Sequence, residues 1–174
     1  MATTSSIARL NPKLQAVFGF LTAAEDTELR NIIRDIDEAL LEFAQYYGLD
    51  RAGWEGTGLD LMWFPSGQVA LSSFISTGID GSDRVDFLVS LKPSWVDGDF
   101  PTEPAWEIEA DVYADCQHEI DHKCMHLVDE LPVIRKTNPI EAVIALRDVT
   151  KELFQLAQDK PIEYWLNLAG DSQA

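Results

Sequence analysis

The segment Trp106-Glu-Ile-Glu-Ala-Asp-Val-Tyr-Ala-Asp115 alternates apolar side chains with side chains that are mostly acidic. Successive side chains of a β-strand point to opposite faces of its sheet, so this alternation predicts a half-buried strand with one apolar and one acidic face. The acidic side chains are those of Glu107, Glu109, Asp111 and Asp115. A strand of this kind needs a core on one side only, which favours an antiparallel sheet covered on a single face.

Three segments before this strand, residues 59–63, 69–75 and 85–91, have the same two-residue period. Turn-forming Pro, Gly, Asp and Ser residues separate them. After the strand, the chain is expected to return from Cys124 as a bent or edge strand, because Pro132 interrupts it. These segments together predict an antiparallel meander of four to five strands.

Helical patterns flank the strands at both ends. Asn11-Pro12 and Asn138-Pro139 each pair a capping residue with a proline at the first helical position, and predict helices to about residues 22 and 158. Over residues 27–47, apolar side chains recur every three or four positions, which predicts a long amphipathic helix. The fold class predicted is α+β, with the N-terminal and C-terminal amphipathic helices packed on one face of the meander.

The composition indicates one acidic globular domain. The chain has 174 residues, and its 30 acidic and 13 basic side chains give a net charge of −17. We expect a flexible N-terminus over residues 1–10 and a single domain over residues 11–170. A field of this sign repels nucleic acid and anionic membranes and attracts basic proteins, so neither nucleic acid nor membrane is an expected partner.

The chain is expected to be cytoplasmic. No apolar run approaches the roughly 18 residues that a membrane-spanning helix needs. The 2 cysteines cannot form the disulfide framework that small secreted domains use. The sequence leaves the oligomeric state open, a homodimer included.

One turn carries every cysteine and histidine of the chain: Cys116, His118, His122, Cys124 and His126. If the flanking strands pair, these five nitrogen and sulfur ligands converge at the mouth of a hairpin, and zinc takes four ligands of this type. The spacing does not reproduce a zinc finger. A structural zinc site, a disulfide between the two cysteines, a catalytic site and a cluster without specific metal all remain open.

The sequence favours a non-enzymatic protein. It contains no glycine-rich phosphate loop, no serine nucleophile elbow and no His-Glu-x-x-His motif. The alternative is a metal-dependent or thiol enzyme that uses the cysteine–histidine turn.

The acidic face of the quoted strand is the candidate binding surface. Glu107, Glu109 and Asp111 would form a row that attracts a basic protein partner, and Trp95 and Trp106 would provide aromatic anchors beside it. Inhibitors, immunity proteins and effector chaperones are protein classes with such properties. The alternative is a solvated face whose charges keep the sheet from pairing with other sheets.

Overall fold

The computed structural model describes residues 12–19, 21–47, 57–63, 69–76, 84–94, 105–115, 125–126, 131–161 and 163–165. The N-terminal residues 1–10 lie outside this set. In chain order the elements are α1 (Pro12–Phe18), α2 (Ala23–Tyr46), β1 (Thr57–Trp63), β2 (Val69–Ser76), β3 (Arg84–Pro93), β4 (Trp106–Asp115), β5 (Met125–His126), β6 (Ile134–Lys136) and α3 (Pro139–Gln158).

The strands form one antiparallel sheet in which β1 to β4 follow one another in chain order. The predicted meander is therefore confirmed. The returning chain forms two short strands instead of one, and both β5 and β6 pair with β4. Pro132 lies between them, where a residue without a backbone N–H cannot donate to a strand ladder.

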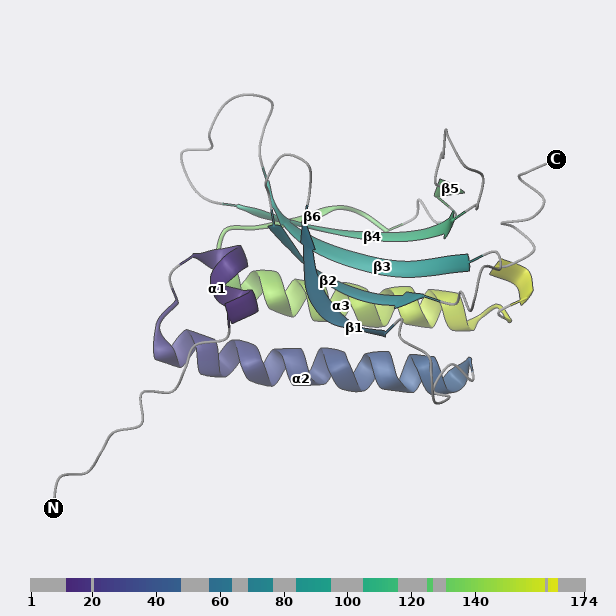
Figure 1. Cartoon of the computed structure of the whole chain (residues 1–174), viewed down its shortest axis with the longest axis horizontal. Coiled ribbons are helices and arrows are strands. Elements are labelled where there is room, and N and C mark those ends of the chain that lie inside the picture. The colour runs from purple at the N-terminus through teal and green to yellow at the C-terminus, as the bar shows by residue number, and fades with distance from the viewer. Residues whose placement is uncertain are drawn as a thin grey trace, which may run out of the picture.

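The long helices α2 and α3 lie side by side on one face of the sheet (Figure 1). The inward-facing positions of neighbouring strands are in register, so that Ile75 lies opposite Phe87 and Phe87 lies opposite Val112. All three side chains are fully buried. The predicted α+β class, with helices on one face, is confirmed.

The helix starts follow from local capping. α3 begins after Asn138, whose side chain accepts hydrogen bonds from the next turn, as the sequence predicted. α2 begins at Ala23, earlier than predicted, because Thr22 and Glu25 form a reciprocal capping box. Within the described residues, no helix has the length and apolar character that crossing a membrane requires.

A buried polar pair lies between the sheet and α3. The hydroxyl oxygens of Ser73 on β2 and Thr150 on α3 lie 2.8 Å apart, and both residues are buried. Thr150 donates its proton to the carbonyl of Leu146 at 2.7 Å, so Ser73 is the donor between the two hydroxyls. This bond fixes β2 relative to α3.

Candidate functional site

The acidic positions of β4 lie on the sheet face opposite the long helices. Ile108 and Val112 of the same strand are fully buried on the helix side, as alternation requires. The Glu109 side chain is 45% exposed, the Glu107 side chain is 17% exposed, and Asp111 is half-buried. We call Glu107, Glu109 and Asp111 the acid row. The structure thus brings these three predicted residues onto one face.

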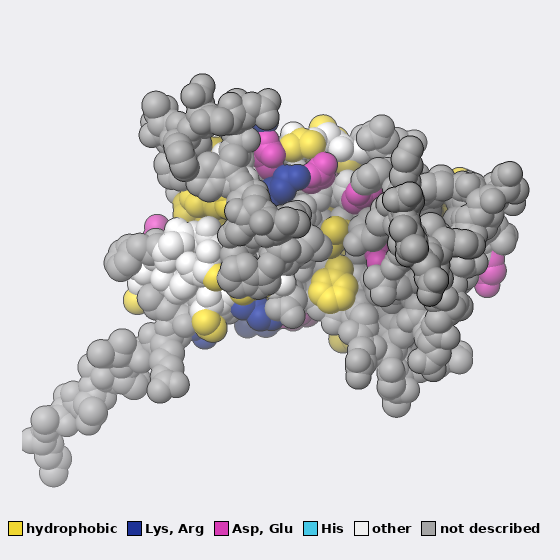
Figure 2. All heavy atoms as spheres, turned by 45° about the horizontal axis from the view of Figure 1, so that its top comes forward, with side chains coloured by type: hydrophobic (Ala, Val, Ile, Leu, Met, Phe, Trp, Pro, Cys, Tyr) yellow, Lys and Arg dark blue, Asp and Glu magenta, His cyan; other side chains and the backbone are white. Residues whose placement is uncertain are grey.

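Two residues of the acid row bind basic side chains from neighbouring strands. The Nζ atom of Lys92 on β3 lies 2.5 Å from Oε2 of Glu109. On the other side, Nη2 of Arg135 on β6 lies 2.5 Å from Oε1 of Glu107, and the hydroxyl of Ser94 donates to the same oxygen at 3.2 Å. Figure 2 shows acidic and basic side chains next to one another on this side of the molecule.

These two basic residues could not be identified as partners from the sequence, because their contacts depend on strand register. Lys92 on β3 and Arg135 on β6 both lie directly opposite Glu107, on the two sides of β4. Arg135 binds Glu107 itself, whereas Lys92 reaches diagonally to Glu109. Opposite charges at paired positions stabilise neighbouring strands. The pairing of β4 with β6 could not be read from the sequence, since the chain between these strands is long.

Trp106 packs in the core. Its side chain is 7% exposed, and its ring meets that of Phe18 of α1 edge-on, with 5.0 Å between the centroids. The ring holds α1 against the end of the sheet and offers little surface to a partner. Trp95, the other aromatic residue predicted for the binding surface, lies outside the described residues.

The cysteine–histidine turn is described only at its end. Cys116, His118, His122 and Cys124 lie outside the described residues, and His126 is described by its backbone alone. In β5, His126 pairs with Tyr113 and Met125 pairs with Ala114. The expected pairing of the flanking strands is therefore confirmed. Among the side chains that the structure describes, no three His, Cys, Asp or Glu residues are grouped to hold a metal ion.

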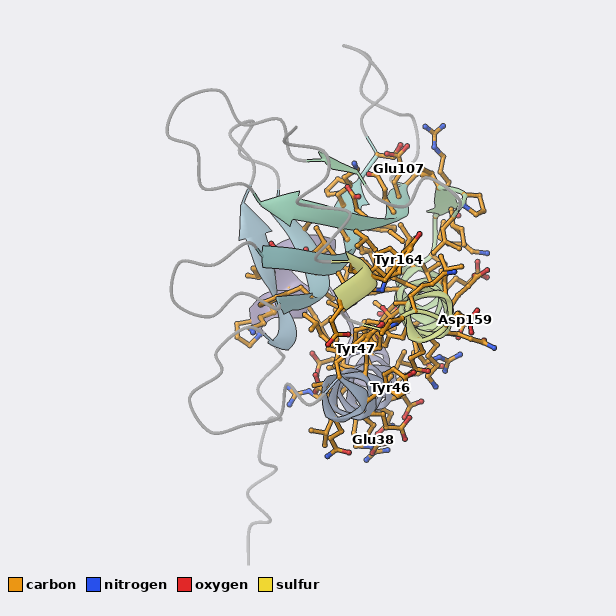
Figure 3. The ribbon with its side chains drawn as sticks, turned by 90° about the vertical axis from the view of Figure 1, so that its right-hand side faces the viewer. Glu38, Tyr46, Tyr47, Glu107, Asp159 and Tyr164 are labelled. Carbon is orange, nitrogen blue, oxygen red and sulfur yellow. The ribbon has the colours of Figure 1, made fainter. Side chains whose placement is uncertain are left out.

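A second feature lies at the end of the helix layer, where Tyr46 of α2 and its neighbour Tyr47 meet the end of α3 (Figure 3). The hydroxyl of Tyr47 lies 2.5 Å from the carbonyl oxygen of Ala157 and 2.9 Å from that of Lys160. Burial raises the pKa of Tyr47 to about 12. Trp165 also donates to the carbonyl of Ala157, at 3.4 Å. These aromatic side chains add donors to carbonyls at and just beyond the end of α3, where the helix itself provides few. The carbonyl of Ala157 also accepts from the backbone N–H of Lys160.

From the sequence, Tyr47 was predicted only as the last residue of the helical segment 27–47. Two adjacent tyrosines at a helix end were the only sign of this contact, and their acceptors follow more than 100 residues later in the chain.

No protein-family model, curated protein or solved structure matches the chain. A functional assignment therefore rests on the side chains described above.

Proposed function

We propose that this protein is a small acidic binding domain without enzymatic activity, which docks a basic protein partner through the acid row. The observation that supports the proposal best is the carboxylate of Glu109, which is 45% exposed and already binds one ammonium group, that of Lys92. A partner's lysine or arginine would approach the same half-exposed row. An inhibitor, an immunity protein or a chaperone of a basic protein would use such a surface.

The ion pair between Lys92 and Glu109 can give way to a partner. Its side chains are 30% and 45% exposed, and ion pairs in contact with solvent contribute only about 0–1 kcal/mol. A partner's cation can therefore replace Lys92 at little cost, while the displaced side chain turns to solvent. The net charge of −17 adds long-range attraction, which accelerates encounter and weakens as salt is added.

The test is recovery of the partner from extracts of the native host at increasing salt concentration. The variant Glu109→Gln with Asp111→Asn removes two charges from the acid row without changing side-chain size. Glu107 is left in place, because it is largely buried and bound by Arg135, so its replacement would disturb the sheet.

The matched control is Glu141→Gln with Glu152→Gln, which removes the same charge from exposed positions on α3. We expect the partner to bind the wild type and the control, to dissociate as salt is raised, and to bind the acid-row variant weakly. Binding that is insensitive to salt, or equal in both variants, argues against the proposal.

A zinc site in the turn between residues 116 and 126 forms part of the proposal. It is supported by the pairing of Tyr113 and Ala114 with the strand that follows the turn, because this pairing brings the two ends of the turn together. Cys116, Cys124 and histidines of the turn are ligands of the type that zinc prefers. The expected result is one zinc per chain after purification without a histidine tag, and a lower melting temperature after chelation. Metal-free protein with unchanged melting would exclude the site.

A further inference from the structure

The two long helices run parallel, so that both C-terminal ends lie at the same end of the molecule. Asp35 of α2 pairs with Arg147 of α3, and further along, Tyr46 of α2 contacts Gln158 of α3. Each helix dipole places about half a negative charge at its C-terminus. Neither helix has a basic residue in its last turn. This end of the helix layer is therefore negative and favours bound cations.

Exposed tyrosines occupy this end (Figure 3). The side chain of Tyr46 is 57% exposed and that of Tyr164 is 40% exposed. Tyr46 is nevertheless held in one orientation, because its hydroxyl donates to the carbonyl oxygen of Gln158 at 2.9 Å. A ring that is already fixed loses little conformational entropy when a partner packs on it.

The exposed rings pack on the half-buried ring of Tyr47 and the buried ring of Trp165. Tyr46 packs edge-on against Tyr47 with 5.1 Å between the ring centroids, and Tyr164 packs edge-on against Trp165 at 5.2 Å. Tyr47 and Trp165 each pack against Phe87 of β3, with 6.0 and 5.7 Å between the ring centroids. The two exposed tyrosines therefore stand on one rigid aromatic cluster that is anchored in the core.

Acidic side chains adjoin both rings. Glu42 lies one helical turn before Tyr46, and Asp159 and Glu163 flank the short connection to Tyr164; all three are exposed. The ring of Tyr164 already binds a cation, since Nζ of Lys160 lies 5.1 Å from its centroid. We call Glu42, Tyr46, Asp159, Glu163 and Tyr164 the helix-end surface.

We propose that the helix-end surface binds an arginine-bearing segment of a protein partner. The guanidinium groups stack on the rings of Tyr46 and Tyr164 and pair with the flanking carboxylates, while the two helix dipoles add attraction. Charge complementarity selects this occupant over a second copy of the chain, which carries the same net charge of −17. The surface is separate from the acid row, so the inference does not depend on the proposed function.

The test measures the affinity of a short fluorescent peptide of repeated Arg-Gly units for the whole protein. Tyr46→Ser with Tyr164→Ser removes both rings without changing the charge, and is expected to weaken binding roughly tenfold, as the loss of two cation–π contacts predicts. Tyr164→Phe keeps both rings and the Tyr46 hydroxyl that bonds to Gln158, and is expected to bind nearly as the wild type does. Val133→Ser, at an exposed apolar side chain outside this surface, is the control for lost apolar area.

A second pair of variants tests the site without touching the tyrosines. Lys160→Gln removes the cation that occupies the Tyr164 ring, whereas Lys151→Gln makes the same charge change at an exposed position on α3. Lys160→Gln is expected to strengthen peptide binding more than Lys151→Gln. The inference is overturned if the serine variant folds and binds as the wild type does, or if the two lysine variants bind equally. It is also overturned if Glu109→Gln with Asp111→Asn is the only variant that weakens peptide binding, because the arginines of the peptide then bind the acid row.

Discussion

Tyr47→Phe tests whether the aromatic contacts at the helix ends hold the two long helices together. The substitution removes only the hydroxyl and keeps the ring, whose centroid lies 4.8 Å from that of Phe43. The carbonyl oxygens of Ala157 and Lys160 then lose the donor that lies 2.5 and 2.9 Å away. The carbonyl of Ala157 keeps the backbone N–H of Lys160 and Nε1 of Trp165 as donors. The loss of the two hydrogen bonds of the Tyr47 hydroxyl is expected to cost about 1.5 kcal/mol of the free energy of unfolding.

The matched control is Tyr46→Phe. This hydroxyl also donates to a carbonyl of α3, that of Gln158, but from a side chain that is 57% exposed. Water can replace it, so we expect a loss of only about 0.5 kcal/mol. For a domain of this size, the Tyr47 variant should melt about 3–6 °C below the wild type. Urea denaturation and thermal melting at pH 7 measure both variants.

The raised pKa of Tyr47 predicts how the stability of the protein changes at alkaline pH. The pKa of Tyr47 is raised from 10.0 to about 12, mainly by burial. Because the unfolded chain loses this proton first, the contribution of Tyr47 to stability is complete below pH 10 and is lost as the pH rises towards 12. The stability of the wild type should therefore fall more steeply than that of Tyr47→Phe over this range. Equal stability of the two tyrosine variants at pH 7, or parallel curves between pH 10 and 12, would refute the reasoning.

Two further substitutions test the layer between sheet and helices and the start of α2. Thr150→Val should lower the free energy of unfolding by about 1–3 kcal/mol, because it leaves the buried hydroxyl of Ser73 without its acceptor. Adding Ser73→Ala should recover part of that loss, which urea denaturation of the single and double variants measures. A double variant less stable than the single one would contradict the hydrogen bond between the two hydroxyls. Thr22→Ala removes the capping box with Glu25 and should cost about 1 kcal/mol, measured by thermal melting. Unchanged melting of that variant would mean that α2 does not depend on its cap.

Much of the fold could be predicted from periodicity. The alternation from Trp106 to Asp115 identified β4 and its two faces, because burial on one side imposes a two-residue period. The pair Asn138-Pro139 located the start of α3. The start of α2 was placed too late, because its first turn carries few apolar side chains and Thr22 with Glu25 was not recognised as a capping box.

The candidate site was predicted less completely, because long-range contacts leave little trace in one sequence. The acid row was visible as alternating charges, whereas its partners Lys92 and Arg135 follow from strand register. Trp106 was expected as an anchor beside the acid row, yet its ring packs on Phe18 of α1. The alternation places Trp106 on the same face as the buried Ile108, so a buried ring agrees with the strand pattern and not with the anchor role.

The most direct test of the proposed function is zero-length crosslinking with a carbodiimide in extracts of the native host. This reagent joins a carboxylate to a lysine amine that it contacts, and mass spectrometry identifies both residues. The 2.5 Å contact between Lys92 and Glu109 provides an internal positive control within the free chain. We expect crosslinks from Glu109 or Asp111 to lysines of a basic partner, and a weaker internal crosslink when that partner is bound. Crosslinks to the partner that map only to carboxylates outside the acid row would contradict it.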